Sequence, residues 1–202
     1  GGIVSFAAAR ALLRIDPPRA LKLLTGSLVL REDWPLARIG SIFQELGPAV
    51  VTEPLVELLV SRPRRGLDRM LRLSRFAHRD RVGAIVRGWL HVSDDPEVLI
   101  AGLDYLEEGE DLPLARGATR HAQWAVRTAA ARALGRIGER RELPLLLELL
   151  RDPVWWVRYR AAEAILRLPG ISSAELESLR DGAQDGFAAE MLAQALAERG
   201  KA

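Results

Sequence analysis

Apolar residues recur along this chain at steps of three and four residues, which is the period of one face of an α-helix. The clearest example is the pair of segments 142–152 and 156–168. The first has an apolar stripe at Leu143, Leu146, Leu147 and Leu150, and the second has one at Val157, Ala161, Ala162, Ile165 and Leu168. Asp152-Pro153 separates the segments, because proline disfavours a helical conformation at the preceding residue. The pattern predicts two helices that pack through their stripes.

The same pattern returns along the chain at a nearly constant interval. The stretch AVRTAAARALGRIG at 125–138 is identical to IVSFAAARALLRID at 3–16 in nine of fourteen positions. One anchor residue marks each unit, 30 or 31 residues from the last: Leu12, Phe43, Leu73, Leu103, Leu134, Ile165 and Leu196. Such a period is typical of a solenoid, in which each helix pair buries its apolar face against its neighbours. We predict one all-α superhelix over residues 1–202, with about six helix pairs and one unpaired N-terminal helix.

The predicted helix at 3–15 corresponds to the second helix of a pair, and no first helix precedes it. We therefore expect it to expose an apolar flank, since nothing upstream covers that side. Gly-Gly stands at the start where an initiator methionine is usual. The sequence is accordingly expected to be a fragment of a longer protein that is truncated on its N-terminal side.

A leucine-rich helix, a turn with Asp-Pro and then a helix of the form VRxxAAxAL resembles the HEAT repeat, in its bacterial HEAT-like version. Residues 111–168 carry the resemblance best, and the remaining units match by period more than by residue. The resemblance implies a solenoid whose second helices line a concave surface. It also implies that the arginines after the motif valines, Arg127 and Arg158, pair with a turn aspartate such as Asp152. His121 replaces that aspartate one unit earlier.

Composition narrows the classes of function. The chain contains no cysteine, which excludes disulfides and cysteine metal sites and fits a cytoplasmic protein, or one on the cytoplasmic face of a membrane. Its formal net charge of +2 argues only weakly for a nucleic-acid or membrane partner. No segment approaches the roughly 20 uninterrupted apolar residues of a membrane span. The histidines His78, His91 and His121 lie in no metal-binding motif, and no nucleotide-binding or nucleophile motif is present. We predict a non-catalytic protein without cofactor or metal.

The first candidate binding surface is an arginine stripe. Residues 61–91 hold nine arginines and two acids, and a single helix over 64–79 would place four arginines within one arc: Arg65, Arg69, Arg72 and Arg79. Because burial of unpaired arginines is costly, we expect the inward residues to be Met70, Leu71, Leu73 and Ala77. The stripe would grip phosphates or an acidic partner. Alternatively the next unit, 94–111, with eight acids and no base, neutralises it; we favour this, because charge runs usually mark solvated faces.

The second candidate surface is a set of tryptophans at the turn into the second helix. Trp124 and Trp155 are 31 residues apart, Trp156 adjoins the latter, and Trp34 falls one place over in its own unit. A row of indole rings along one rim would anchor a partner. Alternatively each ring covers the turn of the next repeat, which is the interpretation we favour, with Trp155 or Trp156 at the surface. Trp89 is expected in the core.

Two functions fit these observations. The first is a non-catalytic scaffold that binds another protein or another domain of its parent chain through a curved helical surface. The alternative is a nucleic-acid binder that holds the phosphate backbone in an arginine-lined groove, which would resemble the HEAT-like DNA glycosylases. In those proteins positive charge extends over several repeats, whereas here it is confined to one and followed by an acidic unit. The scaffold is therefore preferred.

Overall fold

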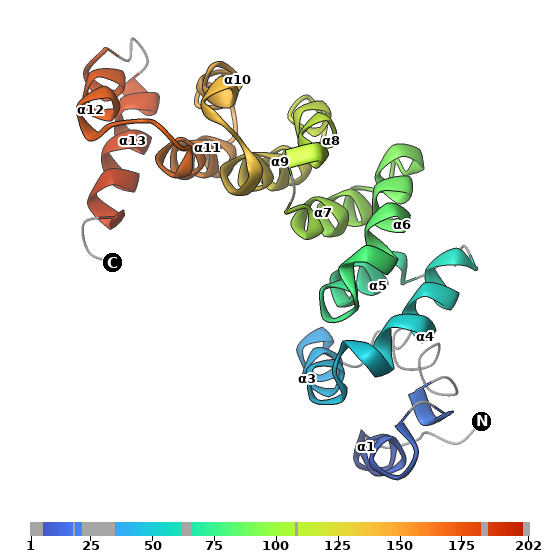
Figure 1. Ribbon diagram of the computed structural model, residues 1–202. Coiled ribbons are helices and arrows are strands. Elements are labelled where there is room, and N and C mark those ends of the chain that lie inside the picture. The colour runs from blue at the N-terminus through green and yellow to red at the C-terminus, as the bar shows by residue number, and fades with distance from the viewer. Residues whose placement is uncertain are drawn as a thin grey trace. The chain divides into compact units, whose positions relative to one another are not determined.

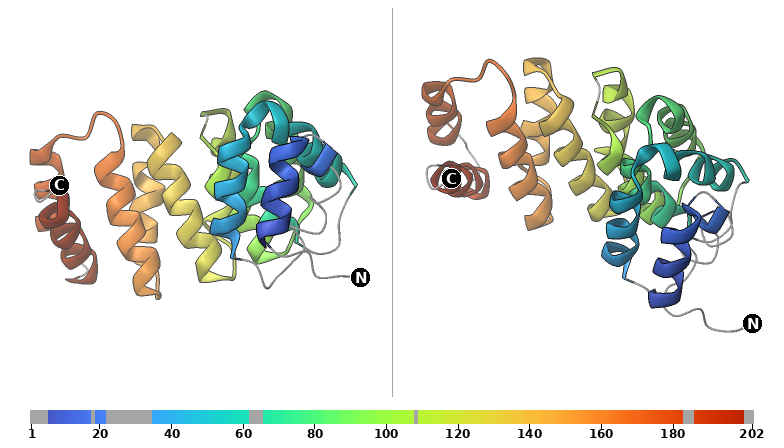
Figure 2. Two further views of the ribbon diagram at one scale, coloured as in Figure 1. Left: turned by 90° about the horizontal axis from the view of Figure 1, so that it is seen from below. Right: turned by 60° about the horizontal axis from the view of Figure 1, so that its bottom comes forward.

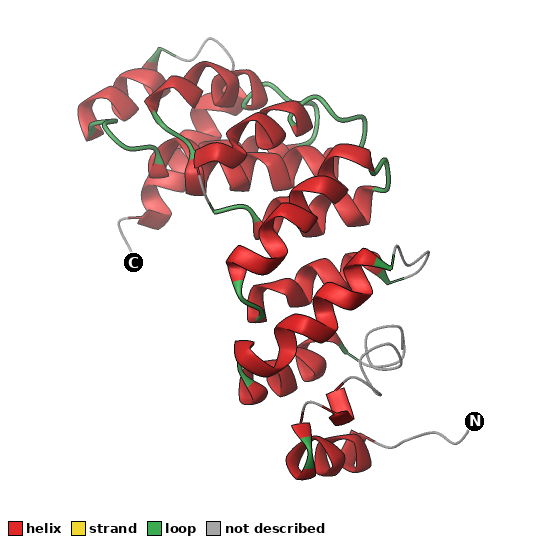
Figure 3. Ribbon diagram, turned by 45° about the vertical axis from the view of Figure 1, so that its right-hand side comes forward, coloured by secondary structure: helices red, strands yellow, loops and turns green. Residues whose placement is uncertain are grey.

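The computed structural model describes residues 6–17, 19–21, 35–61, 66–107, 109–182 and 186–199. Over these residues the protein is all-α and has no strand, as predicted (Figure 3). The helices of the N-terminal half are α1 (Phe6–Ile15), α3 (Leu36–Leu46), α4 (Pro48–Val60), α5 (Leu67–Leu73), α6 (Arg79–Val92) and α7 (Pro96–Tyr105). Those of the C-terminal half are α8 (Leu112–Ala118), α9 (Trp124–Ile137), α10 (Leu143–Leu149), α11 (Trp155–Arg167), α12 (Ser173–Asp181) and α13 (Gly186–Arg199).

The chain forms two compact units, Gly1–Tyr105 and Leu106–Ala202 (Figure 1). In the first unit α4 pairs with α5 and α6 pairs with α7, while the second helices α3, α5 and α7 contact one another in series. In the other unit the pairs are α8–α9, α10–α11 and α12–α13, and the second helices α9, α11 and α13 again contact in series. Figure 2 shows α9 in yellow and α11 in orange side by side. Within each unit the predicted serial stacking of helix pairs is confirmed. The first helix predicted to pair with α3 falls largely outside the described residues.

The apolar anchors of the repeats between the two ends of the series form the core. Phe43, Leu134 and Ile165 have no exposed surface, and Leu73 and Leu103 are 1% exposed. The two terminal anchors differ, because Leu12 is 47% exposed and Leu196 is half-buried. The period of the sequence therefore locates the core, and the ends of the series are where burial is incomplete.

The open side of α1 is apolar, as the sequence predicts. Its exposed residues include Ala8, Ala11, Leu12 and Ile15, which share one helical face. The residues at the same repeat positions in α9, namely Ala130, Ala133, Leu134 and Ile137, are buried. The same residue types are thus buried in one repeat and exposed in another, according to what packs against them.

Small residues set the distance between the second helices of the C-terminal unit. A Cβ atom added to Gly135 of α9 would lie 2.8 Å from the Cα atom and 2.9 Å from the Cβ atom of Ala164 on α11. Both distances are shorter than van der Waals contact, and the Cα atom is backbone that cannot rotate away. The absence of a side chain at Gly135 therefore permits the observed approach of α9 to α11.

We expect Gly135→Ala to lower the free energy of unfolding by up to about 2 kcal/mol. Alanine is favoured over glycine in a helix by about 1 kcal/mol, but overpacking against the Ala164 backbone costs about 1–3 kcal/mol and wins. The matched control is Gly88→Ala in α6, where an added Cβ would meet no atom within 4 Å. Urea denaturation should show the control equal to or more stable than the wild type. Stabilisation by both substitutions would contradict the tight contact.

Candidate functional site

The segment that carries the predicted arginine stripe is not one helix. α5 ends at Leu73, a 3₁₀ turn follows at Ser74–Phe76, and α6 begins at Arg79. The backbone between them is extended, and the His78 N–H donates to Thr52 Oγ1 of α4 at 2.8 Å. The prediction of a continuous helix over 64–79 is therefore wrong, because a tertiary hydrogen bond competes with helical continuation. Arg79 begins a different helix from Arg69 and Arg72.

The inward residues of α5 are the expected ones. Met70, Leu71 and Leu73 are at most 1% exposed, whereas Ala77, beyond the helix end, is half-buried. Ser74 is also fully buried, and its hydroxyl donates to the Met70 carbonyl oxygen at 2.9 Å. The register that leaves the arginines at the surface is thus the one the chain adopts.

The described arginines of this segment contact the chain's own groups. Arg72 Nη2 lies 3.4 Å from Glu97 Oε2, and Arg72 Nη1 lies 3.9 Å from Asp104 Oδ2. Arg79 Nη2 donates to the Tyr105 carbonyl oxygen at 2.9 Å, and its guanidinium lies 4.6 Å from the centre of the Tyr105 ring. Arg69 is half-buried on α5, and Arg65 lies outside the described residues. At Arg72 the neutralising acids belong to the acidic segment 94–111, as the neutralisation hypothesis expects.

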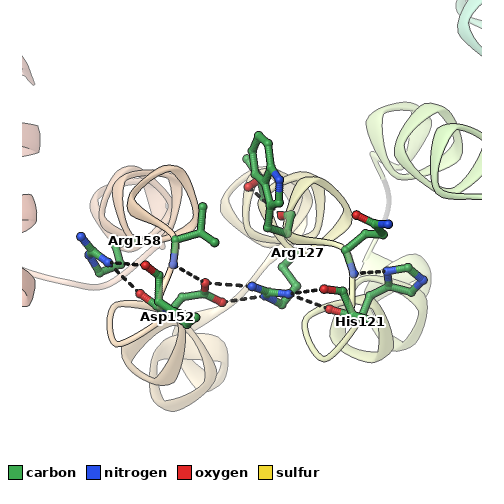
Figure 4. Close-up of polar contacts among 10 residues, drawn as sticks. His121, Arg127, Asp152 and Arg158 are labelled. Carbon is green, nitrogen blue, oxygen red and sulfur yellow. Dashed lines mark hydrogen bonds and ion pairs between the residues drawn. The ribbon is translucent and has the colours of Figure 1, made fainter.

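A chain of arginine contacts links successive turns in the C-terminal unit (Figure 4). Arg127 holds both carboxylate oxygens of Asp152, with Nε to Oδ2 at 2.6 Å and Nη2 to Oδ1 at 2.9 Å. Its Nη1 donates to the carbonyl oxygens of His121 and Ala122 in its own turn, each at 2.9 Å. Asp152 Oδ1 also accepts the Val154 N–H at 2.9 Å. One guanidinium thus connects two turns, and the expected arginine–aspartate pair is confirmed.

Arg158, one repeat later, makes only half of this arrangement. Its Nη1 donates to the Asp152 and Pro153 carbonyl oxygens at 2.8 and 3.2 Å. The guanidinium lies 4.9 Å from the centre of the Phe187 ring on α13. Position 183, one repeat after Asp152, is an alanine in the sequence. At the other end of this chain of contacts, His121 Nδ1 accepts the Gln123 N–H at 3.0 Å, as Asp152 accepts that of Val154. His121 therefore caps its turn in the same way as Asp152 caps the turn one repeat later.

A second ion pair fixes the loop before α10. Glu142 is 2% exposed and accepts Arg116 Nε at 2.8 Å and Nη2 at 2.5 Å. The hydrogen bonds from Arg116 hold the pKa of Glu142 below its ordinary value, against the opposing effect of burial. A carboxylate whose pKa is lowered on folding stabilises the fold above its unfolded pKa, and that contribution is lost as the pH falls through the folded pKa.

Glu142→Gln should lower the free energy of unfolding at pH 7 by about 1–3 kcal/mol, since Arg116 loses a charged acceptor. The difference between variant and wild type should shrink as the pH falls below the ordinary range of a glutamate, because the wild-type carboxyl is then protonated as well. Urea denaturation between neutral and acidic pH measures this difference. A difference that does not depend on pH would show that the charge of Glu142 is not the cause.

The exposed large apolar side chains of the C-terminal unit gather where its second helices begin. The most exposed of them in this unit are Trp124 at 43%, Trp155 at 37%, Trp156 at 50% and Phe187 at 61%. They occupy the first or second position of α9, α11 and α13, and these helices contact in series. We name these four residues, together with Tyr159 of α11, the aromatic ridge.

Contacts around α11 hold part of the aromatic ridge in place. The Trp155 and Tyr159 rings stack at 5.2 Å with 7° between their planes, and the Trp156 ring meets Trp155 edge-on at 4.6 Å. Both tryptophans are exposed, and these ring contacts are made within their own helix. Trp156 is the more exposed of the two, in keeping with the expectation that one of them lies at the surface. That each ring covers the next turn stays a prediction. Trp34 lies outside the described residues.

The sequence analysis did not predict two aromatic residues of the ridge, Phe187 and Tyr159. Phe187 lies 31 residues after Trp156, so the repeat period indicates its position. Tyr159 follows Trp155 by four residues, which is one helical turn.

Trp89, expected in the core, is half-buried, and its Nε1 donates to the Leu59 carbonyl oxygen at 3.3 Å. An indole N–H needs an acceptor when buried, and the adjacent α4 supplies it.

Metal sites and membrane spans were the two other kinds of feature to consider in the described part of the chain. No group of three His, Cys, Asp or Glu side chains is placed there to hold a metal ion. None of the helices among the described residues has the length and apolarity needed to cross a bilayer. The geometry is that of a structural repeat with exposed aromatic side chains at one end of its second helices.

Serially stacked helix pairs, joined turn to turn by arginine contacts, define a helical-repeat protein. The family model of HEAT repeats matches residues 88–166 and 112–198, which together cover 88–198, more than half of the chain. The chain therefore belongs to the HEAT-repeat family, as its motifs predict. HEAT repeats generally serve as protein-interaction scaffolds. No curated protein matches the chain.

Proposed function

We propose that this chain is a non-catalytic protein-interaction module whose partner, another protein or another domain of the parent chain, binds at the aromatic ridge. The observation that carries the proposal is the exposure of Trp124, Trp155, Trp156 and Phe187 on three consecutive second helices. Tryptophan is among the residues most enriched at energetically important positions of interfaces. Single exposed apolar residues need no explanation, but large aromatic residues that recur at the same end of neighbouring helices are typical of a binding surface.

Rigidity supports the same surface. The stacked pair Trp155–Tyr159 and the edge-on contact with Trp156 restrict the rotamers of these rings before any partner arrives. The turns beneath them are joined by the contacts of Arg127 with Asp152 and His121. Binding of a partner therefore costs less side-chain entropy at the ridge than it would if these rings rotated freely.

Photo-crosslinking tests the proposal. A photoreactive phenylalanine analogue replaces Trp156 or Phe187, and a matched control replaces Val92 of α6, an apolar residue that is 73% exposed in the other unit. We expect the two ridge positions to crosslink a common protein, or a common segment of the parent chain, in cells of the source organism. Crosslinking of that product equally from position 92, or no shared product from the two ridge positions, would contradict the proposal.

The nucleic-acid alternative has a separate test. If four arginines each neutralised one phosphate, the logarithm of the duplex association constant would fall linearly with the logarithm of the salt concentration, with a slope of about −3.6. Because Arg72 is paired with Glu97 and Asp104, and Arg79 with the Tyr105 carbonyl, we expect no duplex binding at low salt. Fluorescence anisotropy with a labelled duplex measures it. Binding with a steep slope that Arg69→Glu and Arg72→Glu abolish would favour the nucleic-acid function instead.

A further inference from the structure

We propose that the occupant of the aromatic ridge is an acidic partner segment in the polyproline II conformation, with an apolar side chain at every third residue. This inference rests on the proposed function and names the chemistry of its partner. Three features of the C-terminal unit support it: exposed rings, unneutralised positive charge beside them, and the spacing of the helices that carry them.

The positive charge comes from two repeat-equivalent arginines. Arg120 and Arg151 are 31 residues apart, and each lies four residues before a ridge tryptophan. Both are exposed in the turns that precede α9 and α11, and neither makes an ion pair with a described residue. Carboxylates suit guanidinium groups because the two geometries allow paired hydrogen bonds.

The surroundings add to this charge. Residues 119–128 and 150–160 contain five arginines and one acid, Asp152, which Arg127 already holds. Arg160 is paired with Glu163, so the difference is three positive charges, of which two are those of Arg120 and Arg151 and the third is that of Arg158. The first turns of α9, α11 and α13 carry no acidic residue. The positive ends of these helix dipoles are therefore not offset by side chains of their own first turns, and they favour an acidic occupant.

The spacing of the ridge favours a polyproline II segment. Packed helices lie about 8–10 Å apart. Trp124 and Trp155 occupy equivalent positions of α9 and α11, and Trp156 and Phe187 occupy equivalent positions of α11 and α13, so the rings of each pair recur at about that step. A polyproline II chain has three residues per turn and a rise of about 3.1 Å, so every third side chain lies on one face at steps of about 9 Å. One apolar side chain per helix therefore matches the repeat, and the remaining positions carry acids toward Arg120 and Arg151.

A defined peptide tests the inference. The probe is a fluorescein-labelled peptide of about twelve residues that repeats Glu-Pro-Phe, measured by anisotropy with the full chain. The two comparison peptides repeat Lys-Pro-Phe and Glu-Pro-Ser, which remove the acidic and the apolar contribution in turn. We expect each comparison peptide to bind at least about tenfold more weakly, and the affinity of the probe to fall as salt rises. Equal binding of all three peptides would overturn the inference.

Variants locate the binding. Trp156→Ala, and the pair Arg120→Glu with Arg151→Glu, should each weaken the probe by about tenfold or more. The matched controls are Val92→Ala, for an exposed apolar residue, and Arg167→Glu, for an exposed arginine at the opposite end of α11; both should leave the affinity unchanged. Circular dichroism confirms that each variant is folded. Loss of binding in the controls to the same extent would also overturn the inference.

The two proposals fail in different ways. If the acidic peptide does not bind while positions 156 and 187 still crosslink a common partner, the aromatic ridge is a binding surface and only the chemistry assigned to its occupant is wrong. If neither experiment gives a ridge-dependent signal, the proposed function itself is wrong. A ridge that binds the Lys-Pro-Phe peptide best would assign a basic occupant instead.

Discussion

Asp152→Ala should lower the free energy of unfolding of the C-terminal unit by about 3–5 kcal/mol, the largest effect expected from any single substitution described here. The side chains of Asp152 and Arg127 are only 7% and 14% exposed. Bulk water therefore cannot replace the hydrogen bonds that Arg127 loses. The alanine leaves the Arg127 guanidinium partly buried with half of its acceptors gone. It also leaves the Val154 N–H, at the start of α11, without the carboxylate that caps it.

Asp152→Asn separates these two contributions. Asparagine can still accept the Val154 N–H but carries no charge for Arg127, so its cost should be clearly smaller than that of alanine. Urea denaturation followed by tryptophan fluorescence measures both variants. Arg127→Ala completes a double-mutant cycle, and its coupling energy with Asp152→Ala should reach about 1–3 kcal/mol. Additive effects would show that the pair is not a structural link between turns.

Ile137→Ala should cost about 2–4 kcal/mol, while Ile15→Ala should change stability by less than about 0.5 kcal/mol. The two isoleucines occupy the same position of the repeat, yet Ile137 is 8% exposed and Ile15 is 81% exposed. Removal of a buried isoleucine side chain loses its transfer free energy and leaves a cavity, whereas an exposed one was already in contact with water. The comparison keeps residue type and repeat position constant and varies burial.

Urea denaturation of the two alanine variants checks this pair. Leu134→Ala, at a fully buried anchor, serves as a positive control and should cost at least as much as Ile137→Ala. Equal losses at positions 15 and 137 would mean that the apolar face of α1 is covered in solution. In that event a second chain or another segment packs on Ala8, Leu12 and Ile15, and sedimentation analysis would separate the two cases.

The repeat was predictable from the sequence because burial in a solenoid is periodic. Leu134 and Ile165 are buried for the same reason at the same repeat position, so one well-matched pair of segments predicts the others. The turn at Asp152-Pro153 was likewise predicted from its proline, and the Arg127–Asp152 pair was implied by the resemblance to HEAT repeats. The prediction failed at 64–79, where the hydrogen bond of His78 to Thr52 joins residues 26 positions apart and ends the helical segment.

The candidate surfaces were located only in part. The sequence marks Trp124, Trp155 and Trp156 as repeat-related, but the pattern is the same whether an indole ring packs inward or faces solvent. Exposure depends on what the next helix places opposite the ring, and only the packed structure shows that. The same applies to Arg72, whose charge is obvious in the sequence while its pairing with Glu97 and Asp104 depends on how α5 meets α7.

By itself the sequence determined that this chain is a series of helix pairs, because period, proline-marked turns and small alanines all act through contacts between neighbours along the chain. Tertiary structure decided which members of each repeated set are buried and which face solvent. The physical reason is that burial is a property of a residue's surroundings: Ile15 and Ile137 have the same side chain and the same repeat position, and only their neighbours differ.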